Sequence, residues 1–207
     1  MWANYKFITM NQSKSLVFAS NNAHKLEEVK RILSPLVVLS LNDIGFHSDV
    51  EETGSTLEEN SHIKAQAIYD WLKKQRLEND YDIFADDTGL EIEALNGQPG
   101  VYTARWAGEP ACDANNRKKA LSELEGKSNR NAQFRTVITI IRNGIEQQVE
   151  GAVKGIIATA ESGERGFGYD SLFIPEGYNQ TFAELPSELK NTISHRARAL
   201  VELTKIL

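Results

Sequence analysis

The stretch that decides the expected fold covers residues 81–95 and reads YDIFADDTGLEIEAL. Residues 81–85 form a mostly apolar run suited to a buried strand, and residues 90–95 resume a strand-like pattern. The residues between these two runs favour turns: Asp86, Asp87, Thr88 and Gly89. The pattern therefore predicts two strands separated by an acidic turn.

The chain before this stretch predicts strand, helix, strand and helix in that order. Residues 16–19 are an apolar run, residues 25–33 are amphipathic, and residues 37–41 are again apolar. The second helix is expected to start after Thr56, because Thr56 and Glu59 form a capping box ahead of an apolar stripe with helical spacing.

The chain after this stretch predicts a helix, a long hairpin and a final helix. Residues 115–124 are expected to be helical, and residues 134–142 form a β-branched run that ends in Asn143-Gly144, a strong hairpin signal. Residues 145–159 supply the return strands, and residues 192–206 have the pattern of one helix. Helices that alternate with strands, followed by a hairpin, predict an α/β fold with a long mixed central sheet flanked by helices.

Length and composition are ordinary for one globular domain. The chain has 207 residues, of which 41% are hydrophobic and 25% charged, enough for a continuous core. Because the first residues are polar and aperiodic, we expect residues 1–14 to be a disordered extension and residues 15–207 to be a single domain. Cys112 is the single cysteine, which excludes an internal disulfide and favours the cytoplasm.

Charge and hydropathy exclude two classes of partner. The formal net charge of −6 argues against a surface built for a nucleic-acid backbone. No apolar run approaches the roughly 20 residues of a membrane helix. We therefore expect neither nucleic acid nor membrane as a partner, whereas a mononucleotide needs only a local cluster of cations.

The first candidate site is the polar loop between the first strand and the first helix, which contains Ser20, Asn21, Asn22, Ala23, His24 and Lys25. Free N–H groups and a lysine at a helix start suit a phosphate. The loop is not a Walker A motif, because it lacks glycine. Alternatively, Asn21 or Asn22 only caps the helix and Lys25 is solvated.

The second candidate is the acidic pair Asp86-Asp87. Neighbours on an extended chain point to opposite sides, so at most one of the two carboxylates should face a given site. That carboxylate could bind Mg²⁺ together with polyphosphate oxygens, or both acids could serve an ordinary turn. Glu51 and Glu52 could complete a metal site or be solvated surface. Without a nucleophile signature, direct attack by water is the simpler chemistry.

Two further candidates lie near the C-terminus. In the segment formed by residues 166–170, glycines allow close backbone approach and aromatic rings can stack on a planar ligand; a plain turn with core aromatics is the alternative. Lys190 can converge with His195 and Arg196 only if Lys190 lies before the last helix, with Asn191 or Thr192 as the cap. Otherwise these side chains form the solvated face of an amphipathic helix.

Six short segments resemble, in this order, those of the Ham1-type inosine triphosphate pyrophosphatase family, and the resemblance runs from residue 16 to about residue 203. Each segment is short, but six in sequence are very specific. They are SNNAHK at residues 20–25, ETG at 52–54 with EN at 59–60, ADDTGL at 85–90, PGVYTAR at 99–105, FGYD at 167–170 and SHR at 194–196.

This resemblance implies a homodimer with a long mixed sheet and two lobes, with the active-site cleft between the lobes. It also implies hydrolysis of inosine, deoxyinosine and xanthosine triphosphates to the monophosphate and pyrophosphate, which clears deaminated purines from the nucleotide pool. The implied cofactor is Mg²⁺, with Mn²⁺ as a substitute.

The resemblance also assigns roles by position. Asp87 would be a metal ligand and the base for a water that attacks the α-phosphate, Glu52 or its neighbour Glu51 would help to hold the metal, and Asp86 would support the turn. Residues 20–25 would grip the triphosphate, helped by Lys64, which shares a helix face with Asn60. The substrate, chiefly its base and 6-keto edge, would be bound by Thr88, Phe167, Gly168, Tyr169, Asp170, Lys190, His195 and Arg196.

Two other functions fit parts of the pattern. A Maf-like nucleotide pyrophosphatase would bind phosphate with a similar loop but prefers modified pyrimidine substrates. The SHR and ADDTG segments favour the purine family. A non-catalytic nucleotide-binding module would keep the phosphate loop without needing Asp87 and Glu52.

Overall fold

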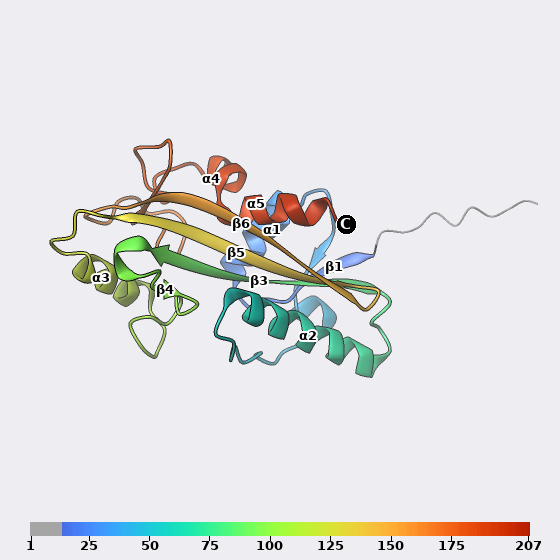
Figure 1. The fold of residues 1–207 in the computed structure, drawn as a ribbon. Coiled ribbons are helices and arrows are strands. Elements are labelled where there is room, and N and C mark those ends of the chain that lie inside the picture. The colour runs from blue at the N-terminus through green and yellow to red at the C-terminus, as the bar shows by residue number, and fades with distance from the viewer. Residues whose placement is uncertain (1–13) are drawn as a thin grey trace, which may run out of the picture.

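The computed structural model describes residues 14–207 (Figure 1). The predicted disordered extension lies outside the described residues, apart from residue 14. The strands are β1 Ser15–Phe18, β2 Val38–Leu39, β3 Tyr81–Ile92, β4 Pro99–Gly100, β5 Asn131–Arg142, β6 Ile145–Ile157 and β7 Phe173–Pro175. The α-helices are α1 Ala23–Ile32, α2 Leu57–Gln75, α3 Asp113–Glu123, α4 Ser187–Ile193 and α5 His195–Thr204.

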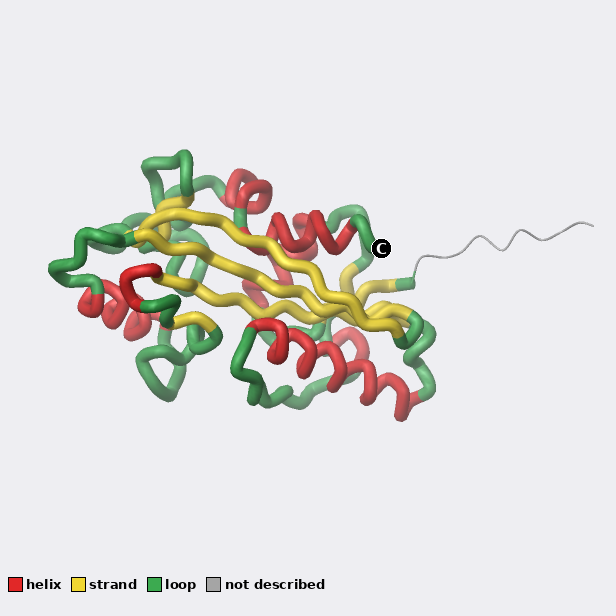
Figure 2. Tube along the Cα trace, in the orientation of Figure 1, coloured by secondary structure: helices red, strands yellow, loops and turns green. Residues whose placement is uncertain are grey.

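One mixed sheet runs through this structure, with the strand order β2-β1-β3-β5-β6-β7 and with β4 also paired to β3. β1 is parallel to β2 and β3, whereas β3, β5, β6 and β7 pair antiparallel. In Figure 2 the long strands form a continuous layer with helices on both sides. The predicted mixed sheet flanked by helices is confirmed, and the two-lobed shape stays a prediction.

The prediction of an acidic turn at residues 86–89 is wrong, because β3 continues through them without a break. Each of these residues has a register partner on β5, from Asp86 opposite Ile138 to Gly89 opposite Arg135. The long β5–β6 hairpin thus supplies a hydrogen-bond ladder that overrides the low strand propensity of Asp, Asp and Gly. The extended conformation ends at Ile92, and Glu93–Leu95 forms a 3-10 turn.

Helices cover both faces of the sheet around β1 and the first half of β3. Helix α2 lies on one face, and α1 and α5 lie on the other (Figure 1). Neighbouring residues of β3 accordingly enter different cores: Phe84 packs with residues of α1 and α5, and Ile83 packs with residues of α2. A third core, built around Phe134, packs α3 and β7 against the end of β3, the start of β5 and the end of β6. These layers fix β3 at the centre of the molecule.

One edge of β3 is interrupted. β1 pairs with residues 81–84 of this strand, and β4 pairs with Leu90 and Glu91. Among the described residues no strand pairs with residues 85–89 on that edge. The acidic pair therefore lies at a gap between two neighbouring strands, where other parts of the chain and a ligand can reach it.

The single C-terminal helix predicted for residues 192–206 is also wrong, because the chain forms two helices, α4 and α5, that meet at Ser194. Ser194 has extended backbone angles, and its side chain accepts a hydrogen bond from the N–H of Ala197. The cap of the last helix is therefore Ser194 rather than Asn191 or Thr192. Lys190 does precede that helix, as convergence with His195 requires, but it does so from a helix of its own.

Three other predictions have mixed outcomes. Thr56 caps α2 as expected, by accepting from the N–H of Glu59. Asn143 and Gly144 both have positive φ, at 51° and 75°, as a tight hairpin requires. The second strand is shorter than predicted, since only Val38–Leu39 pair with β1.

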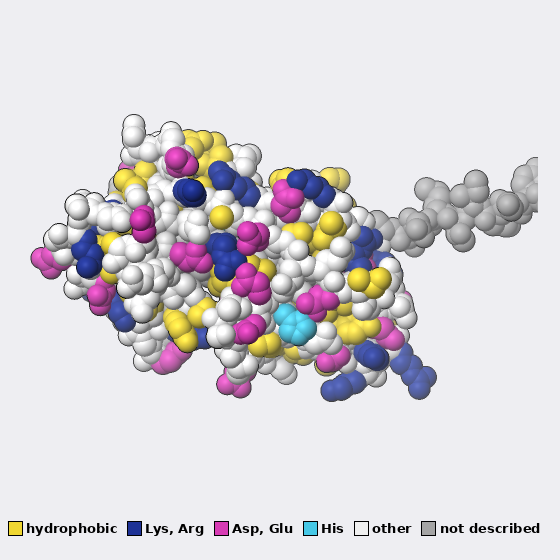
Figure 3. All heavy atoms as spheres, in the orientation of Figure 1, with side chains coloured by type: hydrophobic (Ala, Val, Ile, Leu, Met, Phe, Trp, Pro, Cys, Tyr) yellow, Lys and Arg dark blue, Asp and Glu magenta, His cyan; other side chains and the backbone are white. Residues whose placement is uncertain are grey.

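No helix among residues 14–207 is long and apolar enough to cross a membrane. On the face drawn in Figure 3, acidic and basic side chains are interspersed, with small apolar areas between them.

Candidate active site

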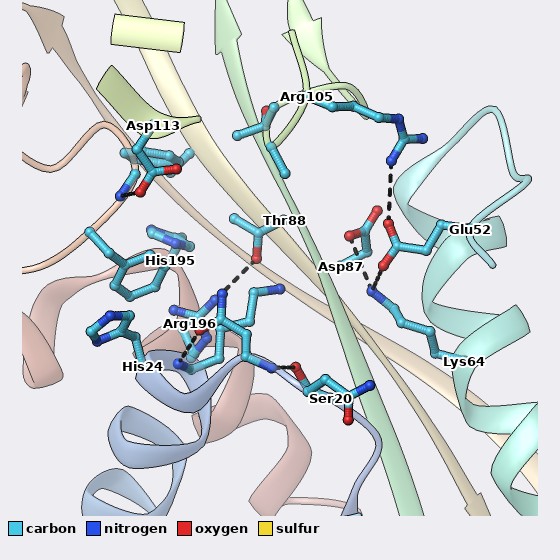
Figure 4. A pocket seen from close by; sticks show the side chains of 18 of the residues that line it. Ser20, His24, Glu52, Lys64, Asp87, Thr88, Arg105, Asp113, His195 and Arg196 are labelled. Carbon is cyan, nitrogen blue, oxygen red and sulfur yellow. Dashed lines mark hydrogen bonds and ion pairs between the residues drawn. The ribbon is translucent and has the colours of Figure 1, made fainter. Parts of the chain in front are cut away.

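A cavity of about 430 Å³ opens at the gap in the edge of β3. Residues from strands β3 and β5, from helices α1 to α5 and from four connecting loops line it (Figure 4). Of the predicted site residues, those on its wall are Ser20, Asn21, Asn22, His24, Lys25, Glu52, Lys64, Asp87, Thr88, Phe167, Gly168, Tyr169, Asp170, Lys190, His195 and Arg196. Ala23 and Glu51 are not on this wall. The six segments far apart in the sequence therefore meet in one place.

The loop between β1 and α1 forms one side of the cavity. The side chain of Asn22 accepts a hydrogen bond from the N–H of Lys25 at 3.1 Å, so Asn22 caps α1 as one of the sequence interpretations had it. Lys25 is not solvated, because its Nζ donates to Asp86 Oδ1 at 2.8 Å. The loop thus combines a helix cap with an ammonium group directed at the strand.

Asp86 is buried among cations. Its Oδ1 accepts from Lys25, and its Oδ2 accepts from Arg196 Nη2 at 2.9 Å and from Arg196 Nε at 3.1 Å. Burial alone would raise the pKa of Asp86, but the charges of Lys25 and Arg196 outweigh burial and hold the pKa below its ordinary value. Asp86 is thus a permanent anion that fixes two cations of the site.

Asp87 points to the other face of β3 and has different partners. Its Oδ1 accepts from Lys64 Nζ at 3.3 Å, and its Oδ2 accepts from Asn60 Nδ2 at 3.3 Å. Asn60 is itself oriented by the N–H of Gly54, which donates to Asn60 Oδ1 at 2.8 Å. The expectation that only one carboxylate of the pair faces the cleft is met, because Asp87 lines the cavity and Asp86 does not.

Glu52 lies beside Asp87 in the cavity. Lys64 Nζ donates to Glu52 Oε1 at 2.6 Å, so one ammonium group joins the two carboxylates. Arg105 adds a second cation, with Nη1 at 3.7 Å from Glu52 Oε2 (Figure 4).

The environment of Asp87 raises its affinity for a proton. Burial raises the pKa of Asp87, and the opposing charges of Lys64 and Lys25 do not cancel this effect. The pKa of Lys64 is also raised, because Asp87 and Glu52 outweigh the effect of its burial, and Lys64 stays protonated. The centre therefore contains a partly protonatable carboxylate next to a fixed positive charge.

The opposite end of the cavity is aromatic and cationic. Lys190 Nζ donates to Asp170 Oδ2 at 2.6 Å and to Glu28 Oε1 at 2.8 Å, and it lies 5.0 Å from the ring centroid of Phe167. Asp170 and Glu28 raise the pKa of Lys190 against the effect of its burial. Arg196 Nη1 donates to the second oxygen of Glu28 at 2.6 Å. Two cations are thus held side by side next to a planar ring.

His195 contributes a neutral ring to this end. It is 4% exposed and stacks on Phe134 with ring centroids 4.6 Å apart. Burial and the nearby charges of Arg196 and Lys190 hold the pKa of His195 well below its ordinary value. Its Nδ1 is buried and has no hydrogen-bond partner within the described structure.

Three residues in these contacts had no role assigned from the sequence. The spacing of Glu28 and Asn60 could have indicated that they lie beside predicted site residues. Glu28 follows Lys25 by about one helical turn, and Asn60 precedes Lys64 by four residues, so each pair shares a helix face. Arg105 lies in an irregular loop, where no periodicity indicates a side chain's direction. That loop is fixed by Asn116, whose amide accepts from the N–H of Ala107 and donates to the carbonyl of Ala104.

A mixed α/β sheet with a cleft that combines buried cations, an aromatic end and a carboxylate of raised pKa is typical of an enzyme that acts on a phosphorylated substrate with a planar ring. The model of the Ham1 family matches residues 16–206. The chain belongs to the Ham1 family, as the resemblance of the six segments indicated.

Similar proteins span nearly the same length. A protein of Flavobacterium johnsoniae named dITP/XTP pyrophosphatase is 46% identical over 193 residues, which cover 93% of this chain and 97% of that protein. A Bacillus subtilis protein of the same name is 46% identical over 199 residues, with coverage of 94% and 97%. The solved structure of the Staphylococcus aureus Ham1 protein superposes with a TM-score of 0.81 at 40% identity, and covers 93% of this chain and 97% of that one.

Proposed function

We propose that this enzyme hydrolyses the triphosphates of deaminated purines (inosine, deoxyinosine and xanthosine) to the monophosphate and pyrophosphate. The observation that carries the proposal is the position of Asp87, a buried carboxylate of raised pKa that faces the cavity between Lys64 and Glu52. The names of the related proteins from Flavobacterium johnsoniae and Bacillus subtilis support the substrate class. Removal of deaminated purines from the nucleotide pool is the cellular role that follows.

The triphosphate would lie along the cationic side of the cavity. Ser20, Asn21, Asn22, Ala23, His24 and Lys25 would bind it, with N–H groups at the start of α1 directed at phosphate oxygens. Lys64 and Arg105 would reach the same phosphates from the other side, because both already bind a carboxylate there. This arrangement leaves Asp87 next to the phosphates.

The carboxylates at this end fit a hard divalent cation. Lys64 already holds Glu52 and Asp87 around one positive charge, and oxygen ligands are those that Mg²⁺ and Mn²⁺ prefer. Among residues 14–207 no group of three or more metal-ligating acids, histidines or cysteines occurs. Such an ion, bound by Asp87 and Glu52, would neutralise charge on the phosphates.

Asp87 would act as the base. Its carboxylate takes a proton from a water whose oxygen forms a bond to the α-phosphorus, and the bond from that phosphorus to the oxygen bridging to the β-phosphate breaks. Asn60 and Lys64 orient the carboxylate, each at 3.3 Å. Electrostatic positioning is expected to contribute most of the rate, as in phosphoryl transfer generally.

The aromatic and cationic end would select the base. Phe167 and Tyr169 would flank the ring, and donors on Lys190, Arg196 and His195 would suit a 6-keto oxygen. The remaining contacts are assigned to Thr88, Gly168 and Asp170. The amino group of adenine would leave these donors unpaired, which costs affinity.

The test is a pyrophosphate-release assay with inosine, xanthosine, adenosine and guanosine triphosphates, with and without Mg²⁺. We expect kcat/KM for the inosine and xanthosine substrates to exceed that for adenosine triphosphate by a factor on the order of 10² or more. Preference for modified pyrimidine triphosphates would indicate Maf-like activity instead. Binding without release of pyrophosphate would indicate a non-catalytic module.

We also propose that residues 15–207 act as one domain, that the enzyme is a homodimer and that it resides in the cytoplasm. Sedimentation equilibrium tests the second point, since a dimer has twice the 23.1 kDa mass of the chain.

A further inference from the structure

Helix α3 holds the backbone of Gly168 from both sides. Asp113 Oδ2 accepts a hydrogen bond from the N–H of Gly168 at 2.8 Å, and Arg117 Nη1 donates one to the carbonyl of Gly168 at 2.9 Å. Asp113 and Arg117 are four residues apart and therefore share one face of α3. Figure 4 shows the Asp113 carboxylate beside the loop. We name these two side chains the α3 clamp.

The clamp is itself fixed. Arg117 Nε donates to Glu161 Oε2 at 2.7 Å, and the same carboxylate oxygen accepts from Ser171 Oγ at 3.1 Å. Glu161 and Ser171 lie before and after the loop that contains Gly168. The guanidinium of Arg117 thus has a defined orientation, and α3 is connected to both ends of this loop.

Gly168 has an open side. Its φ is +62°, and a Cβ built on it would meet no heavy atom within 4 Å, so no neighbouring side chain packs against the residue in that direction. The residues on either side are Phe167 and Tyr169, which both line the cavity. Rotation of the Gly168 peptide would therefore move both aromatic rings.

The same loop carries other contacts at the aromatic end. Phe167 stacks on His24 with ring centroids 5.3 Å apart and lies under the ammonium group of Lys190. Asp170 Oδ2 accepts from the N–H of Phe167 at 2.9 Å and also from Lys190. This inner set of contacts fixes the loop at one end, and the α3 clamp fixes it at Gly168.

We propose that Asp113 and Arg117 are positioning residues that hold the Phe167 to Asp170 segment in the conformation that binds the nucleoside part of the substrate. The inference rests on the proposed function, which places the base against this segment. Asp87, Lys64 and Glu52 belong to β3, α2 and a separate loop, so the clamp does not hold the reacting centre.

The clamp predicts a specific kinetic signature. If only a fraction of molecules has the loop in place, the apparent dissociation constant of the substrate rises in inverse proportion to that fraction. Loss of one hydrogen bond to a charged group changes such an equilibrium by about tenfold. The turnover of bound substrate and the binding of pyrophosphate should not change.

The experiment compares Asp113→Ala, Asp113→Asn and Arg117→Gln with Lys118→Ala, an exposed position of the same helix. We expect Asp113→Ala and Arg117→Gln to raise KM for inosine triphosphate about tenfold, with kcat within about twofold and with an unchanged inhibition constant for pyrophosphate. Asp113→Asn keeps an acceptor for the Gly168 N–H and should restore most of the affinity. Lys118→Ala should match the unmodified enzyme.

An unchanged KM in both Asp113→Ala and Arg117→Gln would overturn the proposal, as would an equal rise in the inhibition constant for pyrophosphate. Amide hydrogen exchange over residues 163–170 gives a second readout that needs no turnover, and Asp113→Ala should increase it. Should the unmodified enzyme fail to hydrolyse inosine triphosphate, the proposed function would be wrong. Unchanged exchange in Asp113→Ala would instead refute the clamp.

Discussion

The two neighbouring carboxylates on β3 differ in what their surroundings do to them. Asp86 is enclosed by Lys25 and Arg196, which keep it ionised, whereas Asp87 shares Lys64 with Glu52 and has a raised pKa. The alternation of side chains along an extended strand creates this difference. Asp86 is therefore bound on both oxygens by cations, whereas Asp87 binds a proton more readily than an ordinary aspartate.

Replacement of Asp87 by Asn should abolish most of the activity. The amide cannot take a proton from water, so we expect kcat to fall by about 10² to 10⁴, the usual contribution of a general base. Binding should persist, because the phosphate loop and the aromatic end are untouched. Steady-state kinetics with inosine triphosphate, together with a binding measurement on the variant, check both points; full turnover by the variant would refute the role of Asp87.

The raised pKa of Asp87 predicts the acid limb of the pH profile. The base must be ionised, so kcat/KM should fall as pH drops through the pKa of Asp87, which in the metal-free site lies above the ordinary value of about 3.9 for an aspartate. A pH profile of kcat/KM measures this limb, which should be missing from the residual activity of Asp87→Asn. An acid limb that persists unchanged in Asp87→Asn would contradict its assignment to Asp87.

Replacement of Asp86 by Asn should destabilise the fold. Lys25 and Arg196 would keep their charges in a buried place without a counterion, which costs about 3–5 kcal/mol. The pKa of Asp86 is lower in the folded state than in the unfolded state. Its contribution to the free energy of unfolding is therefore fully present above the unfolded-state pKa and is lost as pH falls toward the folded-state pKa. Denaturant unfolding at neutral pH, with the exposed Asp80→Asn as control, measures the difference.

The break between α4 and α5 at Ser194 brings Lys190 and His195 together. On one continuous helix these residues would lie about 140° apart. The extended backbone of Ser194 lets α4 end and α5 start at a new angle, so both side chains line one cavity.

Ser194→Ala removes the cap of α5 and should cost about 0.5–2 kcal/mol of unfolding free energy. It should also raise KM, because His195 and Arg196 occupy the first turn of that helix. The matched control is Thr192→Ala, since the sequence pattern pointed to residue 192 as a cap whereas the structure places it inside α4. Thermal unfolding and steady-state kinetics on both variants test this; equal effects would contradict the assignment of the cap.

The sequence predicted most elements, but it predicted a turn inside β3 and missed the break between α4 and α5, for physical reasons. Residues 86–89 have turn propensity, yet the long-range ladder with β5 makes them a strand, and pairing of that kind is invisible to local patterns. The break at Ser194 carried only a weak signal, because the apolar spacing continues across it. The hairpin at Asn143 was predictable, since positive φ at two successive residues restricts the residue types.

The helix layer lies against the backbone of the sheet at Gly151 of β6. A Cβ at this position would lie 2.5 Å from the carbonyl oxygen of His195 and would also collide with the backbone nitrogen of Ala199. The sheet and α5 are thus in direct backbone contact at this position.

Gly151→Ala should push α5 away from the sheet and cost about 1–3 kcal/mol, the usual range for overpacking. His195 and Arg196 would move with the helix, so kcat/KM should fall as well. Gln147→Ala, at an exposed position of the same strand, is the control. Denaturant unfolding and steady-state kinetics check the result, and an unchanged stability would show that the layers adjust without strain.

The residues of the cleft could be predicted from the sequence only because the six segments occur together in one order. No single motif specified Asp87 as the cleft-facing acid or joined Glu28 to Lys190 and Arg196, since these contacts form between residues far apart in the chain. The contact of Arg105 with Glu52 depends on the path of an irregular loop. Such geometry exists only once the sheet has assembled.

The interrupted edge of β3 also bears on self-association. An open strand edge is a template for pairing with another chain, because its N–H and C=O groups lack partners. Here β1 and β4 limit the open stretch to residues 85–89, a length of roughly 17 Å. An incoming strand would also have to displace the charged side chains of Lys25 and Lys64. The opening is therefore too short and too charged to pair readily with a strand of another chain.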